Sequence, residues 1–109
     1  MASCAGLQSP AASALLGEWR YVDKIQSCDY VFRRDGNFSG KVIYRKKLIS
    51  EFTGRWSVVG NNLLYTYTSD RLNRIPVGAT DRDKLLSVQK EFFLIEAADG
   101  SQRKYLRIH

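Results

Sequence analysis

The sequence predicts an all-β protein: a closed eight-stranded antiparallel up-and-down β-barrel with a short N-terminal helix. From Glu18 onward, apolar and polar residues alternate with a period of two, which is typical of strands with one buried face. Turn signals such as Asp35-Gly36-Asn37 recur at short intervals, so consecutive strands are expected to be antiparallel neighbours. Closing the sheet on itself removes the two exposed edges that an open eight-stranded meander would leave.

The first element is a short helix, because Ser9 can cap it, Pro10 suits its first turn and Gly17 follows its end. A chain of 109 residues fits one domain with one hydrophobic core. We therefore assign residues 1–8 to a flexible leader and residues 9–109 to a single barrel domain.

The strands follow from the turn residues between them. Residues 69–83 carry no strand pattern, and a loop of this length in a compact domain is commonly functional or mobile. Within it, Thr80 to Asp83 could cap a helical turn. The predicted strands cover residues 18–23, 26–34, 38–45, 48–58, 63–68, 84–90, 92–97 and 103–108.

Alternation also predicts which side chains face the interior. Gly40 and Gly54 fall at inward positions, where a missing side chain would let a strand coil sharply or would simply be tolerated. The other expected inward residues are Cys28, Tyr30, Phe32, Phe38, Val42, Tyr44, Phe52, Trp56, Val58, Leu63, Tyr65, Tyr67, Leu86 and Val88.

The expected lining is rich in tyrosine, whose hydroxyl is costly to bury without a partner. These aromatic residues can fill a narrow barrel by themselves, or they can surround a small apolar or amphipathic ligand that enters past the 69–83 loop. The candidate ligand-binding residues are Tyr21, Tyr30, Phe32, Tyr44, Trp56, Tyr65 and Tyr67.

The chain is basic, with 17 Lys and Arg against 11 Asp and Glu and a formal charge of +6. Such a charge favours anionic partners, but no nucleic-acid motif accompanies it, so we expect no nucleic-acid partner. A cluster in the middle of the chain forms either a solvated sheet face or a patch for phosphate, lipid headgroups or an acidic protein. Its members are Arg33, Arg34, Lys41, Arg45, Lys46, Lys47 and Arg55.

The sequence offers little for catalysis. His109 is the only histidine, so a Ser-His-Asp or Cys-His arrangement lacks a credible base. Zinc spacing and phosphate-binding Gly-rich loops are absent from the sequence, and Asp81 with Asp83 supplies far fewer oxygens than calcium needs. We expect no enzyme activity, no cofactor and no metal site.

The two cysteines have different settings. Cys28 lies in a predicted strand and fits a small buried apolar residue. Cys4 follows Ala2 and Ser3, which resembles the end of a bacterial lipoprotein signal, although Met1 stands where that pattern has leucine. Either a trimmed signal preceded Cys4, which would then be a lipid anchor and a membrane attachment, or the likeness is accidental.

Gly17-Glu18-Trp19 resembles the Gly-x-Trp signature of the lipocalins and their calycin relatives. In that family the Trp plugs one end of the barrel beneath an Arg of the last strand, so the resemblance implies a cation–π contact between Trp19 and Arg107. Further stretches resemble small bacterial lipocalin-like domains of envelope proteins. They are residues 30–40, 54–58, 64–68, 81–88 and 105–107.

The resemblance implies a non-enzymatic binding protein on the periplasmic side of the bacterial envelope, with a cytoplasmic location as the alternative. The barrel would hold a small apolar or amphipathic ligand. Alternatively, the chain is an envelope protein-interaction module, for example a hydrolase inhibitor, that acts through barrel-end loops and a basic face around a filled barrel. A purely structural domain is a third interpretation. We expect a monomer.

Overall fold

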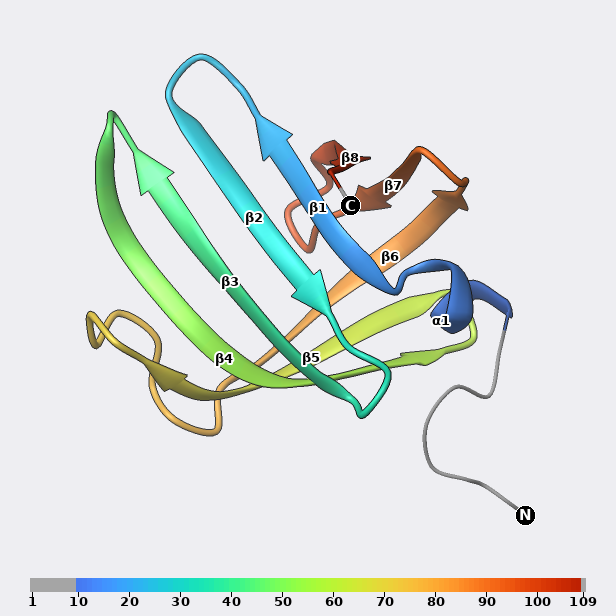
Figure 1. Ribbon diagram of the computed structural model, residues 1–109, viewed down its shortest axis with the longest axis horizontal. Coiled ribbons are helices and arrows are strands. Elements are labelled where there is room, and N and C mark those ends of the chain that lie inside the picture. Colours follow the sequence, from blue (N-terminus) through green and yellow to red (C-terminus); the bar gives the residue numbers. More distant parts are fainter. Residues whose placement is uncertain (1–9, 109) are drawn as a thin grey trace.

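The computed structural model describes residues 10–108, which form one closed antiparallel barrel with a short helix at one end (Figure 1). The strand order follows the chain, and the last strand pairs with the first, as predicted. The elements are α1 (Pro10–Ala14), β1 (Gly17–Val22), β2 (Gln26–Phe32), β3 (Asn37–Tyr44), β4 (Lys47–Val59), β5 (Asn62–Asp70), β6 (Thr80–Val88), β7 (Phe92–Glu96) and β8 (Gln102–Arg107).

The up-and-down order gives the barrel two different ends. At the plugged end, α1 leads into β1 and the side chain of Trp19 is buried. We call the opposite end, where β1, β3, β5 and β7 finish, the open end. Its connections are residues 23–25, 45–46, 71–79 and 97–101.

The seam that closes the barrel is short. Among residues 10–108, strands β1 and β8 pair at Trp19 with Arg107 and at Arg20 with Leu106, and just beyond β8 the Ile108 N–H donates a 2.9 Å hydrogen bond to the Glu18 carbonyl. Toward the open end, β1 and β8 are held together by contacts between side chains. The Tyr21 and Tyr105 rings lie 5.7 Å apart, and the Arg103 guanidinium carbon lies 5.5 Å from the centre of the Tyr21 ring.

The predicted 69–83 loop is too long, because β5 continues to Asp70 and β6 begins at Thr80. The helical turn expected at Thr80 to Asp83 is wrong, since these residues pair with Leu63 to Thr66 of β5. The strand was hidden because Asp81 and Asp83 occupy inward positions, where alternation normally places apolar residues.

The inward assignment of Leu86 is also wrong. Leu86 is 39% exposed, whereas its neighbour Leu85 is 8% exposed and belongs to the core. The register between β6 and β7 shifts between Leu85 and Ser87, and such a bulge adds one residue to the strand. The bulge allows Leu85 and Val88 both to pack against the core despite their odd spacing.

Gly40 and Gly54 are required by packing. A Cβ atom at Gly40 would lie 2.6 Å from the Asp29 carbonyl oxygen, and one at Gly54 would lie 2.2 Å from the Thr66 carbonyl oxygen. The Phe52 ring covers Gly40 and the Phe38 ring covers Gly54, both at 2.7 Å from the same hypothetical atoms. The strands therefore coil closely here because neither position carries a side chain.

Asp70 organises the beginning of the 71–79 connection. Its carboxylate is buried and accepts hydrogen bonds from β4 and from the connection that follows Asp70. Burial acts to raise its pKa, but the hydrogen bonds outweigh burial and hold the pKa below the ordinary value of 3.8. The donors are Ser50 Oγ and the backbone N–H groups of Glu51, Leu72, Arg74 and Ile75, at 2.8 to 3.2 Å.

We expect Asp70→Ala to destabilise the fold by about 2–3 kcal/mol at neutral pH, because the buried Ser50 hydroxyl and several partly buried N–H groups lose their acceptor. The lowered pKa means that Asp70 stabilises the fold above pH 3.8, and this stabilisation is lost as the pH falls through the folded-state pKa. Urea unfolding of both proteins at neutral pH and well below pH 3.8 measures the effect. An equal difference at both pH values would contradict the expectation.

Candidate functional site

The plugged end has the geometry implied by the Gly-x-Trp resemblance. Trp19 is fully buried, and its indole N–H donates a 2.8 Å hydrogen bond to the Leu15 carbonyl. Its ring makes an edge contact with Phe93 at 4.9 Å between ring centres. The Arg107 guanidinium carbon lies 4.1 Å from the centre of the Trp19 ring, within cation–π distance.

Arg107 also fastens the helix to the barrel. Its guanidinium donates hydrogen bonds to the carbonyls of Ala14 at 3.0 Å, Leu16 at 2.8 Å and Lys90 at 2.6 Å. These acceptors belong to the end of α1, the residues after it and the turn between β6 and β7. The plug is thus a structural element that joins three segments distant in the sequence.

Aromatic rings fill the middle of the barrel. Tyr30 lies at their centre, and its ring centre is within 5.4 to 6.3 Å of five other rings, those of Phe32, Phe38, Phe52, Tyr65 and Tyr105. Phe93 stacks on Tyr105 at 4.8 Å, and Phe52 meets Tyr67 at 5.3 Å. Contacts of this kind are those of a packed core, which favours the filled-barrel interpretation over a ligand-sized lumen.

The predicted lining residues divide by position. Four of them are buried in the barrel: Phe32, Trp56, Tyr65 and Tyr67. Tyr21 and Tyr30 are partly buried and pack against the core. Tyr44 is 36% exposed at the end of β3 and is not among the residues that pack against the core, so the structure does not place it in the lining. Cys4, the candidate lipid anchor, lies outside the described residues.

Two further core rings come from strands whose inward faces were not assigned from the sequence. Phe93 of β7 and Tyr105 of β8 are buried. The same alternation would have found them, since Phe93 and Ile95 face inward on β7, as does Tyr105 on β8.

A carboxylate lies among the interior tyrosines. The Tyr65 hydroxyl donates a 3.0 Å hydrogen bond to Asp83, whose pKa is raised by burial. Burial, followed by the neighbouring Tyr30 and Asp83, raises the pKa of Tyr65 well above 10. Burial therefore disfavours the charged form of each group inside the barrel.

Asp83→Asn is expected to stabilise the fold modestly at neutral pH, by about 0.5–1 kcal/mol, because the amide oxygen can still accept from Tyr65 without a buried charge. A raised folded-state pKa opposes folding above that pKa and has no effect well below 3.8, so the difference should vanish in acid. Urea unfolding across this pH range tests the expectation. A variant less stable than the parent at neutral pH would show that the charge is needed.

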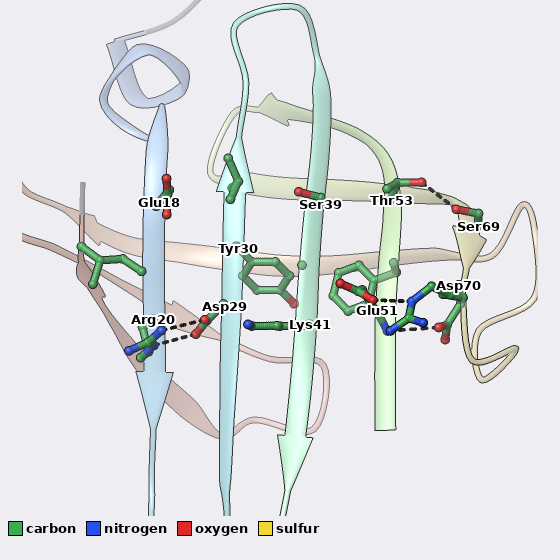
Figure 2. A pocket seen from close by; sticks show the side chains of 15 residues that line it. Glu18, Arg20, Asp29, Tyr30, Ser39, Lys41, Glu51, Thr53, Ser69 and Asp70 are labelled. Carbon is green, nitrogen blue, oxygen red and sulfur yellow. Dashed lines mark hydrogen bonds and ion pairs between the residues drawn. The ribbon is translucent and has the colours of Figure 1, made fainter. Parts of the chain in front are cut away.

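The outer face of β1 to β5 carries a groove of about 940 Å³ (Figure 2). Most of its side chains occupy the outward positions that alternate with the core residues of the same strands, and the inward-facing Tyr30, Gly40 and Phe52 also line it. One row consists of charged residues directly paired across the sheet, in the order Arg20, Asp29, Lys41, Glu51, with Arg71 just after β5. The signs of these five charges alternate.

The ends of this charge ladder are internally paired. Arg20 holds Asp29 through two hydrogen bonds of 2.8 and 2.9 Å, and Arg71 pairs with Glu51 at 2.5 Å. Figure 2 shows Lys41 between Asp29 and Glu51 at the middle of the row. Among the described residues, neither of the two ion pairs within 4.0 Å uses Lys41, so its ammonium group remains available to a carboxylate from outside.

The second row of the groove consists mainly of small hydroxyl side chains. Ser39, Thr53 and Ser69 follow one another across β3, β4 and β5, and Thr53 shares a 2.7 Å hydrogen bond with Ser69. Glu18 and Val31 continue the same row on β1 and β2. Because these side chains are mostly short, the row forms the floor of a groove whose wall is the charge ladder.

The basic cluster does not form one face. All seven of its residues are exposed, but three of them, Arg33, Arg34 and Arg55, lie toward the plugged end. Lys41 lies in the groove. Arg45, Lys46 and Lys47 lie at the β3–β4 hairpin, at the open end.

Residues 10–108 contain no group of three or more His, Cys, Asp or Glu placed to hold a metal ion. Within the same residues, no helix has the length and apolar character to cross a membrane. Neither observation assigns a role to the groove.

Comparison with known proteins identifies the fold alone. No protein-family model matches the chain, and no curated protein matches it. A solved structure, that of a lipocalin-like protein from Bacteroides uniformis ATCC 8492, is similar with a TM-score of 0.63 and 18% sequence identity. The match covers 87% of this chain and 99% of that chain. The barrel thus has a lipocalin-like fold.

Proposed function

We propose that this chain is a non-enzymatic envelope binding protein whose outer groove receives a polypeptide segment of a partner, while the barrel serves as a filled scaffold. The observation that carries the proposal is the contrast between the two faces of β1 to β5. Their inner face is occupied by aromatic rings in mutual contact, and their outer face has an open groove.

The chemistry of the groove favours a segment that carries a carboxylate beside uncharged groups, because the lining also includes the apolar side chains of Tyr30, Val31, Phe52 and Ile108. Lys41 offers a cation flanked by two acidic residues, and the Ser39, Thr53 and Ser69 hydroxyls offer hydrogen bonds along the floor. Flanking acids exclude a run of negative charges but admit one carboxylate followed by uncharged groups. A loop of a hydrolase or of another envelope protein would have this character.

Peptide display against the purified protein tests the groove, with counter-selection on Thr53→Arg, which fills the floor. We expect enriched peptides to carry an acidic residue and to lose at least tenfold in affinity toward Lys41→Glu and Thr53→Arg. Thr66→Arg is the matched control, because Thr66 is exposed on β5 outside the groove. Peptides that bind all variants equally would overturn the proposal.

Titration with fatty acids and isoprenoids, read by Trp56 fluorescence, tests the alternative that the barrel holds a small apolar ligand. Trp56 packs on Phe32 at 5.0 Å between ring centres and donates to the Arg33 carbonyl, so lumen opening would change its environment. We expect no saturable change. Saturable binding that Thr53→Arg leaves intact would favour a small apolar ligand inside the barrel and contradict the filled scaffold.

The envelope location rests on the Ala-Ser-Cys pattern before Ala5. Mass spectrometry of the native product from its own host is the direct measurement. We expect a diacylated cysteine derived from Cys4. An unmodified chain recovered from the cytoplasm would contradict the envelope location. The peptide-binding role of the groove would then depend on the display experiment alone.

A further inference from the structure

Two hairpin tips lie together at the open end of the barrel (Figure 1). One is the β1–β2 turn, residues 23–25, and the other is the β3–β4 turn, residues 45–46. The backbone N–H of Arg45 donates a 2.7 Å hydrogen bond to the Ile25 carbonyl, which joins the two turns. We call these turns, with Val22, Tyr44 and Lys47 beside them, the paired tips.

The paired tips expose apolar side chains. Val22 is 61% exposed, Ile25 43% and Tyr44 36%. A shallow depression of about 430 Å³ lies between the turns, with Val22, Ile25 and Ile43 among its lining. Exposed apolar side chains gathered on a projecting turn indicate contact with another apolar phase.

The same tips are strongly basic. Lys24, Arg45, Lys46 and Lys47 are all exposed there. Asp23 is the only carboxylate among the residues of the paired tips, and it is already engaged. It accepts hydrogen bonds from the Tyr21 hydroxyl and from the backbone N–H groups of Ile25 and Gln26 at 2.8 to 2.9 Å, which lower its pKa.

The backbone at the β3–β4 turn shows that its residues are not those the turn itself prefers. Arg45 has φ 49° and Lys46 has φ 67°, both in the left-handed region. A two-residue hairpin turn with this geometry favours Asn-Gly, because longer side chains are strained there. Two cations occupy these positions instead, and backbone strain of this kind is common at functional sites.

We propose that the paired tips bind the surface of an anionic phospholipid bilayer, with Ile25 and Val22 entering the interface and the surrounding cations contacting headgroup phosphates. Tyr44 would lie at headgroup depth, where tyrosine is enriched. This site is separate from the groove, whose charges alternate in sign.

A bilayer fits the paired tips better than an acidic protein does. Two adjacent turns form a narrow projection, whereas a stable protein interface needs roughly 800 Å² on each partner. A lipid surface can engage a projection of this kind through a few inserted side chains and a few phosphate contacts. Each such cation strengthens attachment about fivefold.

Flotation with phosphatidylglycerol-containing vesicles tests the proposal, with phosphatidylcholine vesicles as the neutral comparison. Binding should require the anionic lipid and weaken with salt. The double variant Arg45→Asn/Lys46→Gly removes two cations and supplies the residues that the turn prefers. We expect this variant to unfold at a higher temperature than the parent and to bind anionic vesicles about thirtyfold more weakly.

The matched control is Arg33→Asn/Arg34→Asn, which changes the net charge equally at the plugged end and should bind almost as the parent does. Ile25→Ser should weaken the binding that persists at high salt. If the control loses as much vesicle binding as Arg45→Asn/Lys46→Gly does, the effect is one of overall charge and the proposal is wrong. If Arg45→Asn/Lys46→Gly is less stable than the parent, the strain argument is wrong.

Two more outcomes would overturn the proposal. The first is binding to polyglutamate with no binding to vesicles, which would indicate an acidic protein instead. The second is vesicle binding abolished by Thr53→Arg, which would place the contact in the groove. Vesicle binding retained by Thr53→Arg keeps the two proposals independent.

Discussion

Replacing Trp19 by alanine is expected to lower the free energy of unfolding by about 3–5 kcal/mol, the range found for large aromatic side chains removed from cores. Trp19 is fully buried, and the cavity would lie between Phe93 and the Arg107 guanidinium. Its loss also leaves the Leu15 carbonyl without the indole donor. Urea denaturation followed by far-UV circular dichroism measures the change.

Trp19→Phe separates volume from hydrogen bonding, because it retains a ring but cannot donate to Leu15. We expect this variant to retain more than half of the lost stability. Arg107→Met, which preserves much of the aliphatic stem, should instead lose the bonds to Ala14, Leu16 and Lys90. A cost below about 1 kcal/mol for Trp19→Ala would mean that the plug contributes little to the fold.

Gly54→Ala is expected to destabilise the barrel by about 3 kcal/mol or more, at the upper end of overpacking effects. The added methyl group would lie 2.2 Å from the Thr66 carbonyl oxygen on β5 and 2.7 Å from the Phe38 ring. The ring can move, but the carbonyl belongs to the β4–β5 ladder and cannot move without breaking it. Thermal and urea unfolding both measure the loss.

Two controls separate the causes of this loss. Gly60→Ala meets no atom within 4 Å and differs only in its φ of +61°, so it should cost about 1–2 kcal/mol. Adding Phe38→Leu to Gly54→Ala should not restore stability, because the backbone clash remains. Full rescue by Phe38→Leu would show that the ring, and not the carbonyl, is the obstacle.

Alternation and turn chemistry predicted the barrel and its strand order, because most of the strands satisfy both. They failed where the inward face is polar or the strand is irregular. Asp81 and Asp83 hid the start of β6, and Leu85 and Leu86 are chemically identical, so no pattern shows which one the bulge turns outward.

The plug could be predicted because Gly17, Trp19 and Arg107 form a recognisable signature. The groove could not, since its ladder joins Arg20, Lys41 and other residues far apart in the chain. Each charge lies at an outward position that alternation already indicates, but their order across the sheet depends on the register of four strand pairs. The paired tips could not be predicted from the sequence, because the positive φ angles of Arg45 and Lys46 are known only from the structure.

The seam has a consequence for how the chain is made. Trp19 lies in the first strand, yet the guanidinium over its ring and its backbone partner across the seam both belong to Arg107. During synthesis the Trp19 ring therefore remains uncovered until residue 107 has left the ribosome. Closure of the barrel then joins its first and last strands, which are the most distant strands along the chain. Contacts of such long range form slowly. A ribosome stalled before β8 should thus display a nascent chain whose Trp19 remains open to quenchers and to chaperones.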